Sequence, residues 1–222
     1  MHVFIRELGV VAMQIQTFLL LYFVWFVLGG LLILKTAQPT LHLALNTLHF
    51  PGSDDIFVVL SYVGDRRVAW VMGGALLLRK QFRHGATVLL ATIGAGLATE
   101  FFKYQVFGTV PRPVAIFGTD GPLRLVPGFE NHLDYSMPSG HSAIAFALMT
   151  ALALVSTLKL ETPPRWQQGS LFVLALGAAF SRVYLSEHFL EDVYWGSLLG
   201  VVCGLVAFVL VRWVSSMRKT NT

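Results

Sequence analysis

The segment SRVYLSEHFLED, residues 181–192, places His188 and Asp192 four positions apart between two long apolar stretches. Residues at this spacing share one face of a helix. A carboxylate beside an imidazole can accept a hydrogen bond from one ring nitrogen, which fixes the tautomer and leaves the other nitrogen free to attack an electrophile. The pair therefore predicts a nucleophilic histidine or, considered alone, an ordinary structural hydrogen bond.

A second histidine, His141, ends the sequence Pro-Ser-Gly-His at residues 138–141. Ser139 is a good N-cap, and the first turn of a helix offers unpaired N–H groups and a partial positive charge that bind phosphate. Gly140 has no side chain, so an oxyanion could approach the backbone closely. His141 could then protonate a leaving oxygen on the far side of the phosphate. On their own, Ser139 and Gly140 would indicate only a helix cap.

Three basic residues, Lys103, Arg112 and Arg182, fall at the same expected ends of the apolar segments as the two histidines. Arginine pairs bidentately with phosphate oxygens. Taken singly, Lys103 could be a membrane-interface anchor, and Arg112, between Pro111 and Pro113, could belong to an extended loop. Charged groups near a membrane are costly and usually functional. Their joint occurrence with the histidines therefore predicts a site for an anion of high charge.

Together these residues resemble the type 2 phosphatidic acid phosphatase superfamily, whose signatures are Lys-x6-Arg-Pro, Pro-Ser-Gly-His and Ser-Arg-x5-His-x3-Asp. The second and third signatures are complete here, and all three lie within residues 103–192. The first departs from the pattern, because eight residues separate Lys103 from Arg112. A two-residue bulge containing Gly108 would restore the reach of Lys103.

The resemblance implies that His188 is the nucleophile and carries a phosphohistidine intermediate, that Asp192 orients it, and that His141 is the general acid and later the base. It also implies that no metal or other cofactor is needed, which agrees with the possibility that fixed cations meet the charge of a transferring phosphoryl group. The remaining residues that it assigns bind the phosphoryl oxygens: Lys103, Arg112, Ser139, Gly140 and Arg182.

Acidic residues that could hold a metal are not evident in the sequence. Asp54 and Asp55 are adjacent, so their side chains would point in different directions on a helix. We expect a solvated turn there, after Pro51 and Gly52.

The composition is that of a membrane protein. Of the 222 residues 55% are hydrophobic and 13% are charged, whereas soluble domains carry about 25% charged residues. The uncharged stretch 17–34 is long enough to cross most of a hydrocarbon layer about 30 Å thick. The net charge of +4 does not require a nucleic-acid partner, because membrane proteins gather Lys and Arg on their cytoplasmic side.

We expect an all-α fold in which residues 1–222 form one polytopic bundle without a separate soluble domain. A short interfacial helix is expected within TLHLALNTLHF, residues 40–50, where leucines recur at helical spacing; a loop packed on the bundle fits equally well. Six membrane-spanning helices are predicted, at residues 10–35, 66–81, 84–105, 139–159, 166–185 and 190–213.

The distribution of Lys and Arg predicts the orientation of the bundle. Apart from the three expected site cations, these residues concentrate at the helix ends on the side of the two termini. We therefore expect both termini to be cytoplasmic and the site to face outward. The sequence contains no Asn-x-Ser/Thr site, which favours a bacterial inner membrane and a periplasm-facing site.

Three glycines, Gly196, Gly200 and Gly204, form a small-residue stripe on the last predicted span. Such a stripe lets another helix approach closely. We expect it to pack inside the bundle near the fifth span; a homo-oligomer contact is the alternative.

A site at the outer membrane surface fits a substrate with lipid tails and an accessible phosphate. The resemblance suggests phosphatidate, phosphatidylglycerol phosphate, a polyprenyl diphosphate or a lipid A phosphate as substrate. The alternatives are a lipid phosphotransferase that uses the same histidine and a non-catalytic lipid transporter on this scaffold.

Overall fold

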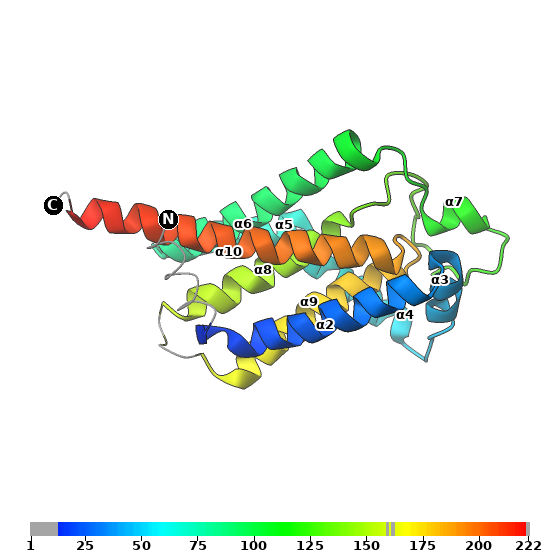
Figure 1. Ribbon diagram of the computed structural model, residues 1–222, viewed down its shortest axis with the longest axis horizontal. Coiled ribbons are helices and arrows are strands. Elements are labelled where there is room, and N and C mark those ends of the chain that lie inside the picture. The colour runs from blue at the N-terminus through cyan, green and yellow to red at the C-terminus, as the bar shows by residue number, and fades with distance from the viewer. Residues whose placement is uncertain (1–12, 159, 161–162, 221–222) are drawn as a thin grey trace.

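The computed structural model describes residues 13–158, 160 and 163–220, which form helices and loops without β-strands (Figure 1). The helices are α2 (Gln16–Lys35), α3 (Gln38–Asn46), α4 (Ser53–Ser61), η1 (Tyr62–Gly64), α5 (Arg66–Leu78), α6 (Phe82–Phe101), η2 (Phe102–Phe107), α7 (Pro113–Phe117), α8 (Gly140–Ser156), α9 (Arg165–Tyr184) and α10 (Leu190–Thr220).

The bundle is built around α8, which packs against α6, α9 and α10. Every residue of α8 from Ser142 to Ala151 is buried. Many of these side chains are alanine or serine, so the neighbouring helices can approach the α8 backbone closely. The central helix therefore begins at the residues of the Pro-Ser-Gly-His signature and fixes where they stand.

The glycine stripe of α10 packs inside the bundle, as expected. A methyl group at Gly200 would overlap the carbonyl oxygen of Ala143, and one at Gly204 would overlap the side chain of Thr150. The expected partner was wrong, because the stripe contacts the fourth predicted span, α8, and not the fifth. The small residues of α8 offer the closest approach, and their contact also covers the stripe, so it is not an exposed homo-oligomer face.

Six long helices match the six predicted spans in order. Three of them are long and apolar enough to cross a membrane: Gln16–Lys35, Phe82–Phe107 and Leu190–Met217. Helix α8 is apolar but shorter, and α5 has 13 residues, fewer than the roughly 20 that span a bilayer. The count of six spans therefore stays a prediction. The expected start of the first span, at residue 10, lies outside the described residues.

Helix α3 confirms the short helix predicted at residues 40–50, and the loop alternative is wrong. Its Leu41, His42 and Asn46 side chains are buried against the end of the bundle. Helices α3, α4 and α7 lie at this end, whereas the first turn of α2 and the last turns of α10 lie at the other (Figure 1). Whether α3 also touches lipid headgroups stays a prediction.

The segment with Asp54 and Asp55 is solvated, as expected, but it is a helix and not a turn. Both residues stand in the first turn of α4, where acidic side chains favour the positive end of the helix dipole. Asp54 also binds two residues that are distant in sequence, Arg124 and Tyr184.

Candidate active site

His188 lies in the loop between α9 and α10 and is 2% exposed. Its Nδ1 atom is 3.4 Å from Oδ2 of Asp192. The same carboxylate oxygen accepts hydrogen bonds from the Ser136 hydroxyl (2.5 Å) and the Phe189 N–H (2.9 Å). Asp192 is thus held from three sides, and the Nε2 atom of His188 is the nitrogen left for chemistry.

The expected helical face shared by His188 and Asp192 does not exist, because α10 begins at Leu190. Asp192 stands in the first turn of α10 and binds the N–H of Phe189, as a helix-capping carboxylate does. The pairing therefore arises from a loop folding back onto a helix N-terminus.

The pKa of His188 is lowered well below its ordinary value, first by burial and then by the charges of Arg112 and Lys103. Burial disfavours the charged imidazolium. The neutral form, which is the nucleophilic one, is therefore favoured near neutral pH.

Lys103 stands on the π-helix η2, which continues α6 and ends at Gly108 with a φ angle of +66°. A π-helix places more residues in each turn than an α-helix. The connection from Lys103 to Arg112 is thus irregular and passes through Gly108, while the two-residue bulge stays a prediction. Lys103 and Arg112 then line one cavity together with His188.

Arg112 and Arg182 come from distant parts of the chain and share one acidic partner, Glu187. Nη1 of Arg112 donates to the carboxylate of Glu187, and Nη2 of Arg182 lies 3.3 Å from the Oε2 atom of that carboxylate. The Nε atom of Arg112 donates to the carbonyl of Asp134 (2.8 Å). The Nε atom of Arg182 is buried with no hydrogen-bond partner among the described residues, so this N–H is available to an anion.

The N-terminus of α8 brings Ser139, Gly140 and His141 to the same place. Ser139 is the N-cap, as predicted: its hydroxyl oxygen accepts from the Ser142 N–H (3.4 Å) and hydroxyl (2.9 Å). Gly140 and His141 face the cavity, whereas Ser139 is fully buried behind them. The backbone of His141 rests against Gly64, where a methyl group would overlap the His141 carbonyl.

Two connected cavities meet at these residues. The inner cavity, of about 390 Å³, is lined by six of the eight predicted site residues: Lys103, Arg112, Gly140, His141, Arg182 and His188. The outer cavity, of about 1050 Å³, shares His132, His141 and Arg182 with it. Asp192 and Ser139 stand immediately behind the lining, so the structure brings all eight residues together.

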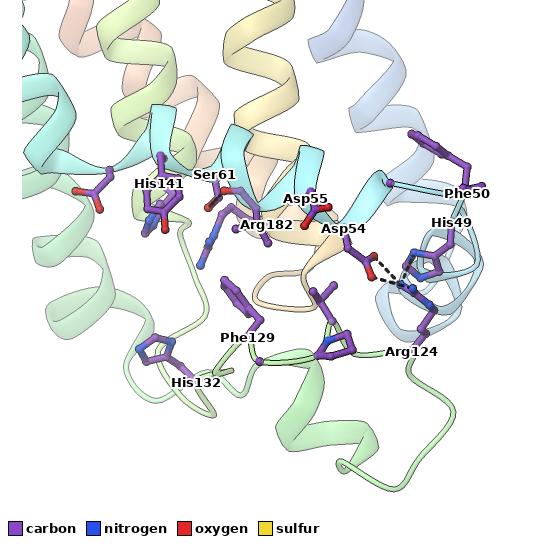
Figure 2. Close-up of a pocket in the computed structure, with 18 of the residues that line it drawn as sticks. His49, Phe50, Asp54, Asp55, Ser61, Arg124, Phe129, His132, His141 and Arg182 are labelled. Atoms are coloured by element: carbon purple, nitrogen blue, oxygen red, sulfur yellow. Dashed lines mark hydrogen bonds and ion pairs between the residues drawn. The ribbon is translucent and has the colours of Figure 1, made fainter.

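Figure 2 shows His141 and Arg182 at one end of the outer cavity and His49, Asp54 and Arg124 at the other. Arg124 donates to both carboxylate oxygens of Asp54, at 2.8 and 2.9 Å. These bonds, with one from Tyr184 (2.5 Å), lower the pKa of Asp54 to about 2. The pair therefore fastens the loop around Arg124 to α4, which forms the opposite wall.

Two residues that support the site were not identified from the sequence. Glu187 precedes His188 directly, and its full burial beside two arginines is the feature that marks it. Ser136 belongs to none of the three signatures, yet its hydroxyl binds Asp192. The sequence offered a signal for Glu187, because it is an acidic residue inside a motif that also contains the cation Arg182. It offered no signal for Ser136.

Metal ligation has no candidate in residues 13–158, 160 and 163–220, which contain no group of three or more His, Cys, Asp or Glu side chains placed to hold an ion. The metal-free chemistry stays a proposal, and chelation is its test.

The family model that matches this chain is the PAP2 superfamily, over residues 84–216. This match covers more than half of the chain and includes all three signatures, from Lys103 to Asp192. The chain belongs to the PAP2 superfamily. The observed gathering of the signature residues agrees with this membership.

Two similar proteins are diphosphatases by name. The chain is 33% identical to dolichyldiphosphatase 1 of Dictyostelium discoideum over 85 residues, which cover 36% of this chain and 37% of that protein. It is 31% identical to undecaprenyl-diphosphatase of Sulfolobus acidocaldarius over 147 residues, which cover 65% and 64%. The matches thus span less than two thirds of each relative.

Two solved structures share the fold. The crystal structure of Aquifex aeolicus LpxE superimposes with a TM-score of 0.62 and 27% identity, covering 79% of this chain and 97% of that one. A PAP2-type phosphatidylglycerolphosphate phosphatase from Bacillus subtilis gives 0.59 and 19%, covering 90% and 96%. The second likeness concerns the fold alone.

Proposed function

We propose that this PAP2 superfamily protein is a lipid phosphate phosphatase that hydrolyses a phosphate mono- or diphosphate ester through a phosphohistidine. The observation that carries the proposal is His188, whose Nδ1 faces the Asp192 carboxylate, beside a cavity that also holds Lys103, Arg112 and Arg182. An imidazole with one nitrogen held and the other free, next to three cations, suits attack on a phosphoryl group.

In the first step, Nε2 of His188 attacks phosphorus and the bond from phosphorus to the lipid oxygen breaks. Protonated His141 gives its proton to that leaving oxygen. In the second step, His141 takes a proton from water, whose oxygen attacks phosphorus and breaks the P–N bond. Inorganic phosphate and neutral His188 result, and His141 is again protonated.

The cations take the role that Mg²⁺ has in many phosphoryl transfers. The transition state spreads charge over the three equatorial oxygens, so donors must already point at them. Arg112 and Arg182 are held by protein partners, and the N-terminus of α8 adds backbone N–H groups at Gly140 and His141. No metal ion is required for this charge balance.

The substrate class follows from the membrane setting and the relatives. A cavity at one end of an apolar bundle suits a headgroup phosphate whose tails remain in lipid. Relatives named for dolichyl and undecaprenyl diphosphate support a polyprenyl diphosphate, while the resemblance also admits lipid A phosphate, phosphatidylglycerol phosphate and phosphatidate. Six membrane spans, an inner-membrane location, cytoplasmic termini and an outward-facing site belong to the same proposal.

The test is phosphate release from a panel of these lipids in detergent, with and without EDTA, by wild-type protein and His188→Ala. We expect release that survives EDTA and disappears in the variant. A strict requirement for Mg²⁺ would overturn the metal-free mechanism. Transfer of phosphate to a second lipid instead of water would indicate the phosphotransferase, and no turnover of any lipid would favour the transporter.

A further inference from the structure

Glu187 occupies a position inside the candidate site that the proposed chemistry does not use. Its side chain is completely buried, and the Arg112 and Arg182 side chains beside it are 10% and 6% exposed. A buried carboxylate in contact with two cations is costly to desolvate, so its retention calls for a reason beyond packing.

The ring Nδ1 of His132 lies near both oxygens of this carboxylate, 3.4 Å from Oε1 and 3.2 Å from Oε2, whereas their other partners differ. Oε1 accepts from the backbone N–H of His132 (3.1 Å) and lies 3.4 Å from the side-chain amide of Asn131, which ties it to the loop before α8. Oε2 contacts the guanidinium groups of both arginines. One end of the carboxylate is therefore anchored, while the other bridges the two cations.

The backbone of Glu187 reinforces this arrangement. Its carbonyl accepts from Nη1 of Arg112 (3.2 Å), and its N–H donates to the carbonyl of Arg182 (2.9 Å). The next residue is His188. Glu187 therefore contacts both arginines and directly precedes the proposed nucleophile in the chain.

We propose that Glu187 is a positioning residue, whose carboxylate fixes Arg112 and Arg182 in the geometry required by the transferring phosphoryl group. Two adjacent guanidinium groups repel each other, and a carboxylate between them holds both without a substrate. This preorganisation favours the transition state, in which the equatorial oxygens are spread, over the tetrahedral ground state. The negative charge of Glu187 also opposes anion binding, so its benefit is expected in the chemical step.

The primary test is Glu187→Gln, which keeps the shape and removes the charge, with Glu191→Gln as the matched control. Glu191 is the neighbouring glutamate, at the start of α10, and its backbone N–H donates a hydrogen bond to the side-chain oxygen of Gln38 (3.2 Å). We expect Glu187→Gln to lower kcat roughly 10- to 100-fold. Inhibition by inorganic phosphate should be unchanged or stronger, and Glu191→Gln should match the wild type.

A kcat within twofold of wild type would overturn the proposal. So would a joint loss of kcat, phosphate inhibition and thermal stability, because that pattern indicates a purely structural role. If Glu187→Gln does not fold, Glu187→Asp replaces it; the shorter carboxylate should give an intermediate kcat, and full activity would contradict the assignment.

A double-mutant cycle with Arg182→Lys tests whether Glu187 acts through the arginine. The effect of Glu187→Gln on kcat should shrink at least threefold in the Arg182→Lys background, since contacting residues are not additive. Independent, multiplicative effects would show that Glu187 does not act through Arg182.

The inference rests on the proposed function. A second measurement distinguishes failure of the positioning role from failure of the proposed function. Vanadate can adopt the five-coordinate geometry of a transferring phosphoryl group, so its protection of the protein against thermal unfolding needs no turnover. Glu187→Gln should weaken protection by vanadate about tenfold in concentration and leave protection by phosphate unchanged. Equal effects on both anions would refute the positioning role, whereas a wild-type protein that hydrolyses no lipid would refute only the function.

Discussion

The backbone N–H of Ser139 donates a hydrogen bond to the backbone carbonyl of Asp192, at 3.0 Å. This bond joins the first turns of α8 and α10 directly. One helix carries the proposed acid His141, and the other carries the carboxylate that holds His188. A hydrogen bond between main-chain atoms therefore links the element that carries His141 to the element that carries Asp192. Side-chain substitutions at Asp192 leave this hydrogen bond in place.

Asp192→Asn is expected to lower kcat by roughly 10³-fold, because an amide neither stabilises an imidazolium nor enforces the required tautomer. The fold should persist, since the Asn side-chain oxygen can still accept from Phe189. Phosphate release and thermal unfolding measured on the same preparation check both points. Activity within tenfold of wild type would show that Asp192 does not orient the nucleophile.

His141→Ala is expected to lower kcat/KM more for substrates with poor leaving groups than for substrates with good ones. An alkyl phosphate needs protonation of the departing oxygen, whereas p-nitrophenyl phosphate has a leaving group that is stable as an anion. The loss of kcat/KM should be at least tenfold smaller for the aryl ester. Equal losses for both would mean that His141 does not act as the acid.

The pH profile of kcat should be bell-shaped. His188 must be neutral, and its pKa is lowered by burial and nearby cations, so its neutral form persists as the pH falls below 6.5. The acid limb should therefore lie below pH 6.5, with the rate rising as pH increases through it. His141 must be protonated in the same step, and the negative charge of a bound phosphate favours its imidazolium, so the basic limb of kcat should report loss of that proton in the substrate complex. A flat profile from pH 5 to 9, with chemistry rate-limiting, would contradict these roles.

Gly200→Ala should destabilise the bundle by about 1–3 kcal/mol, since the added methyl group meets the backbone of α8. Gly74→Ala is the matched control, because the space around Gly74 is open and alanine is the better helix former. Thermal unfolding in detergent should separate the two variants. Equal stability would show that the close contact of α8 and α10 is not required.

The orientation is testable with single cysteines in a Cys203→Ala background. Asp120→Cys, in the loop after α7, should react with a membrane-impermeant maleimide in intact cells. Ser216→Cys, near the end of α10, should react only after the membrane is opened. The reverse pattern would place the site on the cytoplasmic side.

The sequence predicted the helices well because membrane helices are long, apolar and locally determined. It also pointed to eight candidate site residues, because their joint occurrence in three signatures is hard to explain otherwise; the structure brings them together, and their roles stay a prediction. It did not predict α4, whose first turn holds Asp54 in contact with Arg124 and Tyr184, two residues distant in sequence.

Contacts between residues that are distant in sequence could not be predicted, because they depend on how the helices pack. The glycine stripe of α10 indicated a close neighbour but not which helix it was, because helix order along the chain does not give helix order in the bundle. The role of Glu187 became visible only in the structure, where it contacts Arg112, 75 residues earlier in the chain. Ser136 likewise meets Asp192 across 56 residues.

The inner cavity reaches between α5 and α6, where Arg66 and Glu100 line it, and the outer cavity reaches between α4 and the loop around Arg124. Both end at His141 and Arg182. A candidate active site bordered by two cavities offers two separate routes for the release of products. For the proposed phosphatase we expect the dephosphorylated lipid and the freed phosphate to leave through different cavities, so that neither has to wait for the other before the next turnover begins.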